Sequence, residues 1–92
     1  MAIIAVSFKY KNRNYDKQFE DTTTVREALT EFLKTVGEND TDPNEKIYTF
    51  MYRGRNHINK GHVLNKTLKD AGIISGRGFI VATKNNENTK GK

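Results

Sequence analysis

The stretch TTVREALTEFLKTVG, residues 23–37, decides the fold class of this chain. Thr24 and Glu27 match a capping box, in which each side chain accepts a hydrogen bond from the other residue's backbone amide. Apolar residues then recur at intervals of three and four, as on one face of a helix; they are Val25, Ala28, Leu29, Phe32, Leu33 and Val36. Gly37 follows where helices commonly end in a left-handed residue. The pattern predicts an amphipathic helix over residues 25–36.

A hairpin is predicted before this helix. In residues 3–10 every second residue is apolar, while Ser7 and Lys9 fall on the other face, which is the period of a strand; the residues that share the apolar face are Ile4, Val6, Phe8 and Tyr10. Residues 11–14 are polar and rich in Asn, which tolerates the left-handed backbone angles of a tight turn. In residues 15–19, Tyr15 and Phe19 share one parity. We expect that segment to return beside the first strand as an antiparallel partner.

Shorter elements are predicted after the helix. Residues 47–52 and 79–83 are rich in β-branched and aromatic residues and predict strands, and Ile58 marks the start of a short returning strand. Residues 67–72 predict a single helical turn closed by glycine. One helix that buries its stripe against one face of a sheet gives a two-layer α+β domain. Residues 84–92 contain no apolar side chain and predict a disordered polar tail.

Several local motifs resemble ubiquitin and its relatives, which share the β-grasp fold. They are Thr24-Val25 at the helix start, FMYRGR at 50–55, TLKDAGI at 67–73, and GRG followed by FIV at 76–81. The resemblance covers residues 3–83. It implies a ubiquitin-like roll, in which a four- to five-stranded mixed sheet packs on one helix. We therefore expect one ubiquitin-like domain over residues 1–83 and a tail over residues 84–92.

The resemblance also implies a binding role. Conjugated modifiers and sulfur carriers of this fold end in diglycine, whereas here Gly91 stands alone before Lys92. We expect a non-conjugating, non-catalytic protein–protein interaction module. Partners of ubiquitin often dock on an apolar patch over its third and last strands. By alignment, that patch corresponds to Met51, Ile80 and Ala82, flanked by Arg53, Arg55 and Lys84. Parity alone leaves open that one or more of the apolar residues packs in the core instead.

The charge of the chain is sorted along its length. The formal net charge is +5, but residues 16–45 carry −6 and residues 46–77 carry +6. The basic segment favours a partner protein with an acidic surface. It also allows a nucleic-acid-binding alternative, with Tyr48 or Tyr52 stacking on bases. That surface would contain Arg53, Arg55, Lys60, Lys66, Lys69 and Arg77. The acidic segment and the lack of a recognised binding motif argue against this alternative.

Other classes of function are excluded or disfavoured. The chain has no cysteine, hence no disulfide, thiolate nucleophile or Cys-based zinc site. His57 and His62 have no acidic residue nearby in the sequence, so we expect neither metal nor cofactor, and no Ser-His-acid grouping can be assembled. Without a secretory leader or a membrane-length apolar run, we expect a small, basic, cytoplasmic protein that is a monomer. Residues 70–73 also resemble ubiquitin-like accessory components of bacterial type VII secretion systems, which is the alternative function.

Overall fold

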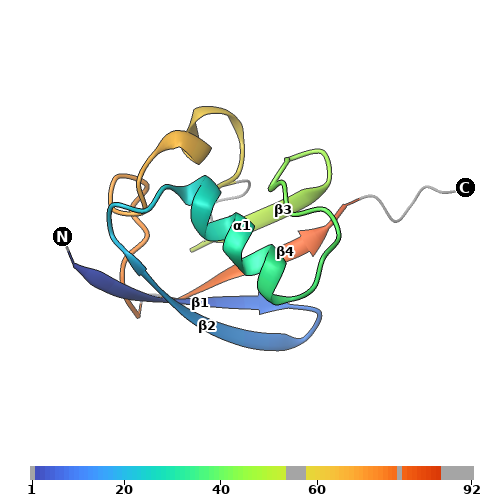
Figure 1. The fold of residues 1–92 in the computed structure, drawn as a ribbon, viewed down its shortest axis with the longest axis horizontal. Coiled ribbons are helices and arrows are strands. Elements are labelled where there is room, and N and C mark those ends of the chain that lie inside the picture. The colour runs from blue at the N-terminus through green and yellow to red at the C-terminus, as the bar shows by residue number, and fades with distance from the viewer. Residues whose placement is uncertain (1, 54–57, 77, 86–92) are drawn as a thin grey trace, which may run out of the picture.

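A computed structural model describes residues 2–53, 58–76 and 78–85 of the chain. Its elements follow the predicted order, from an N-terminal hairpin through a helix to a last strand (Figure 1). They are β1 (Ile3–Tyr10), β2 (Arg13–Glu20), α1 (Val25–Thr35), β3 (Tyr48–Tyr52), the 3₁₀ helix η1 (Gly61–Asn65) and β4 (Phe79–Lys84). Among the described residues, no helix is long and apolar enough to cross a membrane.

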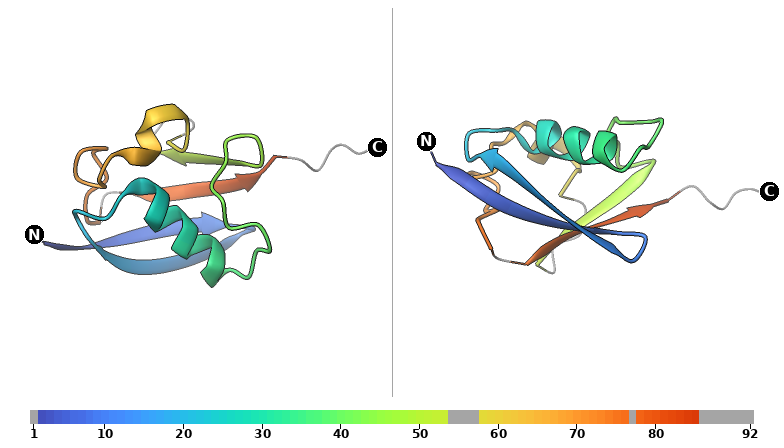
Figure 2. Two further views of the ribbon diagram at one scale, coloured as in Figure 1. Left: turned by 45° about the horizontal axis from the view of Figure 1, so that its top comes forward. Right: turned by 60° about the horizontal axis from the view of Figure 1, so that its bottom comes forward.

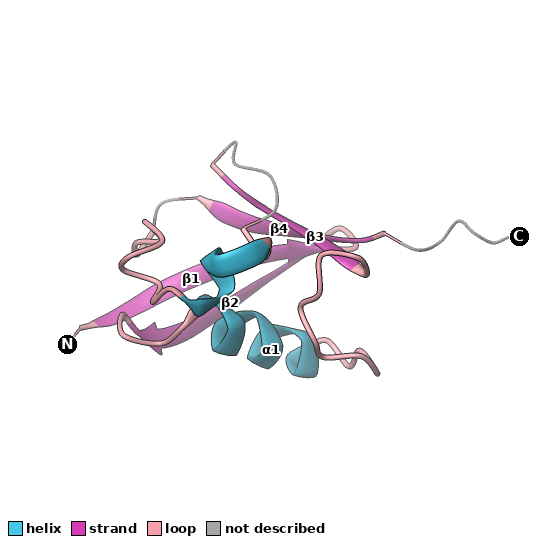
Figure 3. Ribbon diagram, turned by 90° about the horizontal axis from the view of Figure 1, so that it is seen from above, coloured by secondary structure: helices cyan, strands magenta, loops and turns pink. Residues whose placement is uncertain are grey.

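The four strands form one mixed sheet in the order β2-β1-β4-β3. β1 pairs antiparallel with β2 and parallel with β4, and β3 pairs antiparallel with β4. A parallel pair needs a long crossover connection, and the chain between β1 and β4 supplies α1 and η1. Both helices lie on the same face of the sheet (Figures 2 and 3). The predicted α+β class, with a mixed sheet packed on one α-helix, is confirmed.

The hairpin turn is shorter than predicted. Lys11 and Asn12 have φ angles of 52° and 65°, so these two residues alone make the turn. Tyr10 and Arg13 face each other as the first pair of the ladder. A two-residue loop with positive φ at both positions matches the right-handed twist of the flanking strands. Pairing therefore begins at Arg13, two residues before the predicted start of the second strand.

The capping box of α1 is present. The Thr24 side chain accepts a hydrogen bond from the Glu27 amide at 3.2 Å, and Glu27 Oε1 accepts one from the Thr24 amide at the same distance. The helix ends at Thr35, one residue before the predicted end, and Gly37 has a φ of 82°. The apolar stripe is buried from Val25 to Leu33. The local sequence thus predicted the start of α1 correctly and its end to within one residue.

The core lies between α1 and the inner face of the sheet. Phe8 of β1 stacks on Phe32 of α1 with ring centroids 4.2 Å apart, and both side chains are fully buried. Burying one such side chain contributes about 1.5–3 kcal/mol. Phe50 of β3 and Ile80 of β4 complete the inner face. The sheet is therefore fixed to α1 by side chains from three of its strands.

Three features between β3 and β4 differ from the predictions or refine them. Ile58 begins no described strand, although its amide donates to the Phe50 carbonyl at 2.9 Å. The 3₁₀ helix η1 was not predicted, because a five-residue element carries little periodicity. Residues 67–72 form the predicted turn, in which the Ala71 amide donates to the Thr67 carbonyl at 2.9 Å and Gly72 has a φ of 81°.

The folded part extends past the predicted start of the tail. Lys84 is the last residue of β4, and its ammonium lies 3.3 Å from Glu38 Oε1. The Asn85 amide donates to the Ile47 carbonyl at 2.7 Å, and its side chain accepts from Thr49 Oγ1 at 2.7 Å. The expectation that residues 84 and 85 belong to a disordered tail is wrong, because polar partners hold them. Residues 86–92 lie outside the described residues.

Candidate interaction surface on the sheet

The sheet face turned away from α1 carries three neighbouring apolar side chains. Met51 of β3 faces Val81 of β4 in the strand register, and Phe79 lies two residues before Val81 on the same face. Met51 and Phe79 are 37% and 44% exposed, and Val81 is half-buried. We call Met51, Phe79 and Val81 the outer strip. Large apolar side chains grouped on a rigid, exposed face are typical of protein interaction sites.

The structure does not bring the predicted patch together. Ile80 is fully buried and Ala82 is 5% exposed, whereas Met51 lies on the opposite face. In the ladder, Ile80 faces Tyr52 and Ala82 faces Phe50, so both belong to the inner face beneath α1. Successive strand residues point to opposite faces. The proposed surface roles of Ile80 and Ala82 are therefore wrong, and the alternative that they pack in the core holds.

The cations predicted to flank the patch do not lie together on one face of the sheet. Arg53 is exposed and has a φ of 50°, and a Cβ on Gly78 would lie 3.7 Å from its Cγ. Its side chain thus passes beside Gly78, next to the outer strip. Lys84 instead points to the other face and pairs with Glu38. Arg55 lies outside the described residues. Lys9, which was not predicted as part of the site, faces Val81 from β1 and is exposed.

Sequence reasoning missed Phe79 and Val81 for an identifiable reason. In β4 both parities are apolar, since Ile80 and Ala82 alternate with Phe79 and Val81. Thr83 shares the parity of Phe79 and Val81 and indicates an exposed face. Lys84, however, shares the parity of Ile80 and Ala82 and indicates the reverse. The sequence of β4 therefore does not indicate which of its two faces is exposed.

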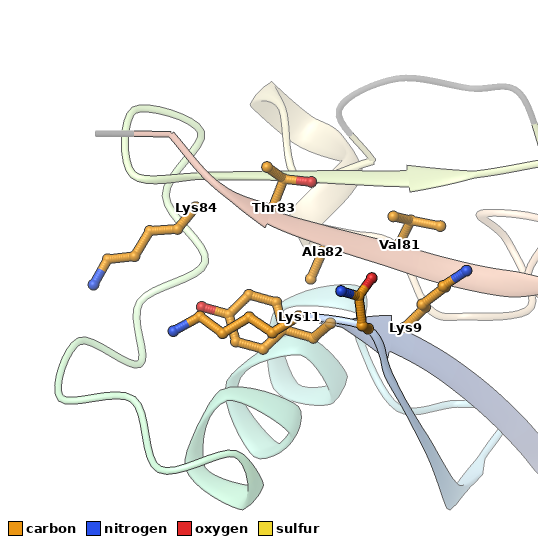
Figure 4. Close-up of a pocket in the computed structure, with 8 residues that line it drawn as sticks. Lys9, Lys11, Val81, Ala82, Thr83 and Lys84 are labelled. Atoms are coloured by element: carbon orange, nitrogen blue, oxygen red, sulfur yellow. The ribbon is translucent and has the colours of Figure 1, made fainter. Parts of the chain in front are cut away.

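A hollow of about 360 Å³ borders the outer strip where β1 and β4 end (Figure 4). It is lined by Lys9, Tyr10, Lys11, Asn12, Val81, Ala82, Thr83 and Lys84. The Lys11 ammonium lies 5.3 Å from the centroid of the Tyr10 ring. In Figure 4 the ammonium of Lys9 points away from those of Lys11 and Lys84. The three lysines do not converge on one point, so the hollow does not form a compact anion site.

Lys11 and Lys84 are instead paired with a partly buried carboxylate, that of Glu38. Glu38 accepts a 2.6 Å hydrogen bond from the Tyr10 hydroxyl and a 3.4 Å bond from the Tyr48 hydroxyl. It also lies 3.3 Å from the Lys84 ammonium and 3.8 Å from that of Lys11. The Tyr10 hydrogen bond, with the two lysines, holds the pKa of Glu38 below its usual value although burial opposes this. The Glu38 cluster thus joins the start of the loop after α1 to β1, β3 and β4.

Tyr48 is held in its neutral form by the same cluster. Burial, together with the nearby charge of Glu38, raises the pKa of Tyr48 to about 12. Its hydroxyl also donates to the Asp40 carbonyl at 2.6 Å. Tyr48 is fully buried and Tyr52 is 3% exposed. The predicted stacking of either ring on nucleic-acid bases is therefore wrong, because neither ring face is free.

The described residues contain no group of three or more His, Asp or Glu side chains that could hold a metal ion. His62 is exposed in η1, and His57 lies outside the described residues. Of the cations assigned to the nucleic-acid alternative, Lys60, Lys66 and Lys69 are exposed and Arg77 is not described. Among these surfaces, the outer strip is the one where apolar side chains lie together on an exposed face, so we take it as the candidate site.

The arrangement of one helix across a four-stranded mixed sheet is that of ubiquitin-like domains. The ubiquitin-like domain of an Arabidopsis thaliana protein matches with a TM-score of 0.67 and 18% identity, over 100% of this chain and 87% of that one. A protein designed de novo on the basis of ubiquitin matches with a TM-score of 0.67 and 12% identity, over 97% and 96% of the two chains. A computationally designed protein based on a human erythrocytic ubiquitin template matches with a TM-score of 0.68 and 13% identity, over 96% of this chain and 99% of that one.

These likenesses establish the fold. The chain has a ubiquitin-like β-grasp fold, as the sequence motifs predicted. No family model and no curated protein sequence matches the chain. At identities of 12–18%, these matches show that the chain shares the fold of those proteins, and they do not show that it shares their partners.

Proposed function

We propose that this protein is a non-catalytic, ubiquitin-like interaction module that binds a partner protein through the outer strip. The supporting observation is that Met51, Phe79 and Val81 lie together on one exposed face of two paired strands. Paired strands hold the backbone positions of the three residues at fixed spacing, so binding through the strip requires little ordering of the backbone. The proposal involves no cofactor and places the protein in the cytoplasm as a monomer.

The chemistry around the outer strip favours a partner with acidic residues at the rim of its apolar contact. Arg53 passes beside Gly78 at one end, and Lys9 faces Val81 across the parallel pair. Cations at the rim of an apolar contact speed encounter with an acidic surface and disfavour a basic one. Met51 adds an adaptable thioether side chain that fits irregular apolar surfaces.

Site-specific photo-crosslinking tests this proposal. A benzophenone amino acid at position 51 should crosslink a partner in cells that contain it, whereas the same group at the exposed position 69 should not. Val81→Lys should remove the crosslink from position 51, because a charge would enter the apolar contact. Circular dichroism verifies that the variant is folded. Equal crosslinking from positions 51 and 69, or a crosslink that survives Val81→Lys, would contradict the assignment.

A further inference from the structure

Met51 carries the one sulfur atom in the described part of the chain. The sequence contains two methionines and no cysteine, and Met1 lies outside the described residues. Met51 is 37% exposed on the outer face of β3, where it faces Val81 of β4. An oxidant that acts on sulfur therefore finds no thiol on this chain that competes with the Met51 thioether.

A peroxide converts a methionine thioether to a sulfoxide. A lone pair of the sulfur attacks one peroxide oxygen, and the O–O bond breaks as the S–O bond forms. With hydrogen peroxide, the second oxygen leaves as water. The sulfur is oxidised by two electrons and the peroxide is reduced by the same two. The flexible apolar side chain thereby becomes polar and chiral.

The place of Met51 in the outer strip gives this oxidation a consequence for binding. Met51 stands opposite Val81 in the ladder, and Phe79 lies two residues before Val81 on the same face. A sulfoxide at position 51 sets a strong hydrogen-bond acceptor among these apolar side chains. A partner surface that fits the thioether removes this oxygen from water and offers it no donor, which costs free energy.

The fold is insulated from the same change. The neighbours of Met51 in the strand, Phe50 and Tyr52, point to the inner face and are buried, whereas Met51 lies outside the core. β3 is held to β4 by backbone hydrogen bonds, which an oxygen on the sulfur leaves intact. Methionine oxidation disrupts packing where the side chain lies in a core. Here the new oxygen lies in water, so the domain stays folded.

We propose that Met51 is an oxidation site through which a peroxide switches off binding by the outer strip. The sulfoxide form stays folded and binds the partner weakly. Methionine sulfoxide reductases reverse the switch: two thiols of the reducing system form a disulfide, and the sulfoxide oxygen leaves as water. This inference rests on the proposed function, because it concerns the regulation of the same strip.

Crosslinking before and after peroxide treatment tests this inference. A benzophenone amino acid at position 79 labels the strip and leaves Met51 in place. The purified chain is oxidised with hydrogen peroxide, freed of peroxide and added to a desalted extract of cells that contain the partner. Mass spectrometry should show one added oxygen on Met51, and circular dichroism should be unchanged. The crosslink should fall about tenfold, because an unpaired polar oxygen enters the contact.

Three controls assign the effect to position 51. Treating the oxidised chain with both stereospecific types of methionine sulfoxide reductase and dithiothreitol should restore the crosslink. Met51→Leu keeps a similar apolar volume and cannot form a sulfoxide. Its crosslink should match that of the untreated chain and should not change with peroxide, although Met1 is still present. Met51→Gln places a polar oxygen at the same position and should crosslink weakly without peroxide.

The outcomes separate this inference from the proposed function. No crosslink from position 79 of the untreated chain would overturn the proposed function, and this inference with it. A crosslink that survives full conversion of Met51 to the sulfoxide would overturn the inference alone. So would a crosslink that peroxide also removes from Met51→Leu, a Met51 that peroxide leaves unmodified, or an oxidised chain that is unfolded.

Discussion

The hydroxyl of Tyr10 donates a 2.6 Å hydrogen bond to Oε2 of Glu38, across 28 positions of the chain. This contact ties the end of β1 to the loop that leaves α1. The Glu38 side chain is only 11% exposed, and Lys84 of β4 lies on its other oxygen. A carboxylate that is largely removed from water needs such partners, because an unpaired one would carry a desolvation cost.

Removing this carboxylate should destabilise the fold. Glu38→Gln keeps the shape of the side chain but loses the charge that Tyr10 and Lys84 contact. We expect a loss of about 1–3 kcal/mol in the free energy of unfolding, measured by urea denaturation. Glu31→Gln, at a pair on the surface of α1, is the control and should change stability by less than about 0.5 kcal/mol. Equal losses in both variants would contradict the special role of Glu38.

Acid should remove the contribution of Glu38. The pKa of Glu38 in the folded protein lies below the ordinary glutamate value of 4.5, mainly because of the Tyr10 hydrogen bond. A lowered pKa adds stability that is present above pH 4.5 and is lost as the pH falls through the folded value. The stability difference between the unmodified chain and Glu38→Gln should therefore shrink as the pH falls from 6 toward 3. A difference that grows with acid would refute this sign.

Tyr48 should titrate later than an ordinary tyrosine. Burial raises its pKa to about 12 from the ordinary tyrosine value of 10.0. The neutral form is thus favoured in the folded state, and its stability contribution is full below pH 10 and falls between pH 10 and 12. Absorbance at about 295 nm should show a late ionisation step, absent from Tyr48→Phe. Tyr15→Phe is the matched control and should retain the late step.

The capping box should stabilise α1 measurably. Thr24→Ala removes the side-chain oxygen that accepts from the Glu27 amide. We expect a loss of about 1 kcal/mol in the free energy of unfolding. Thr30→Ala, inside the same helix, serves as the control and should have an effect below about 0.5 kcal/mol. If Thr24→Ala were no more destabilising than Thr30→Ala, the cap would contribute little to stability.

The two faces of the β3–β4 pair should respond oppositely to truncation. Ile80→Ala leaves a cavity in the core, with an expected cost of about 2–5 kcal/mol in urea denaturation. Met51→Ala truncates a side chain that is 37% exposed and should cost less than about 1 kcal/mol. A larger loss from Met51→Ala than from Ile80→Ala would reverse the assignment of inner and outer faces.

Part of the candidate site could be predicted from the sequence. Residues 47–52 and 79–83 were identified as strands, and Met51 and Arg53 lie at the surface as expected. Their roles in binding remain predictions. Phe79, Val81 and Lys9 were not identified, because β4 is apolar on both faces and β1 joins β4 only in the folded sheet. The Glu38 cluster was missed for a related reason, since its members are scattered along the chain.

The sequence by itself determined the local elements. α1 was predictable because its cap and its apolar stripe are encoded within a few turns, and the β1–β2 hairpin because its turn is local. Only the tertiary structure decided that Ile80 and Ala82 lie buried beneath α1 while Val81 lies on the outer face of the sheet. Which face of β4 is buried depends on which side α1 covers, and neighbouring residues in β4 carry no information about that side.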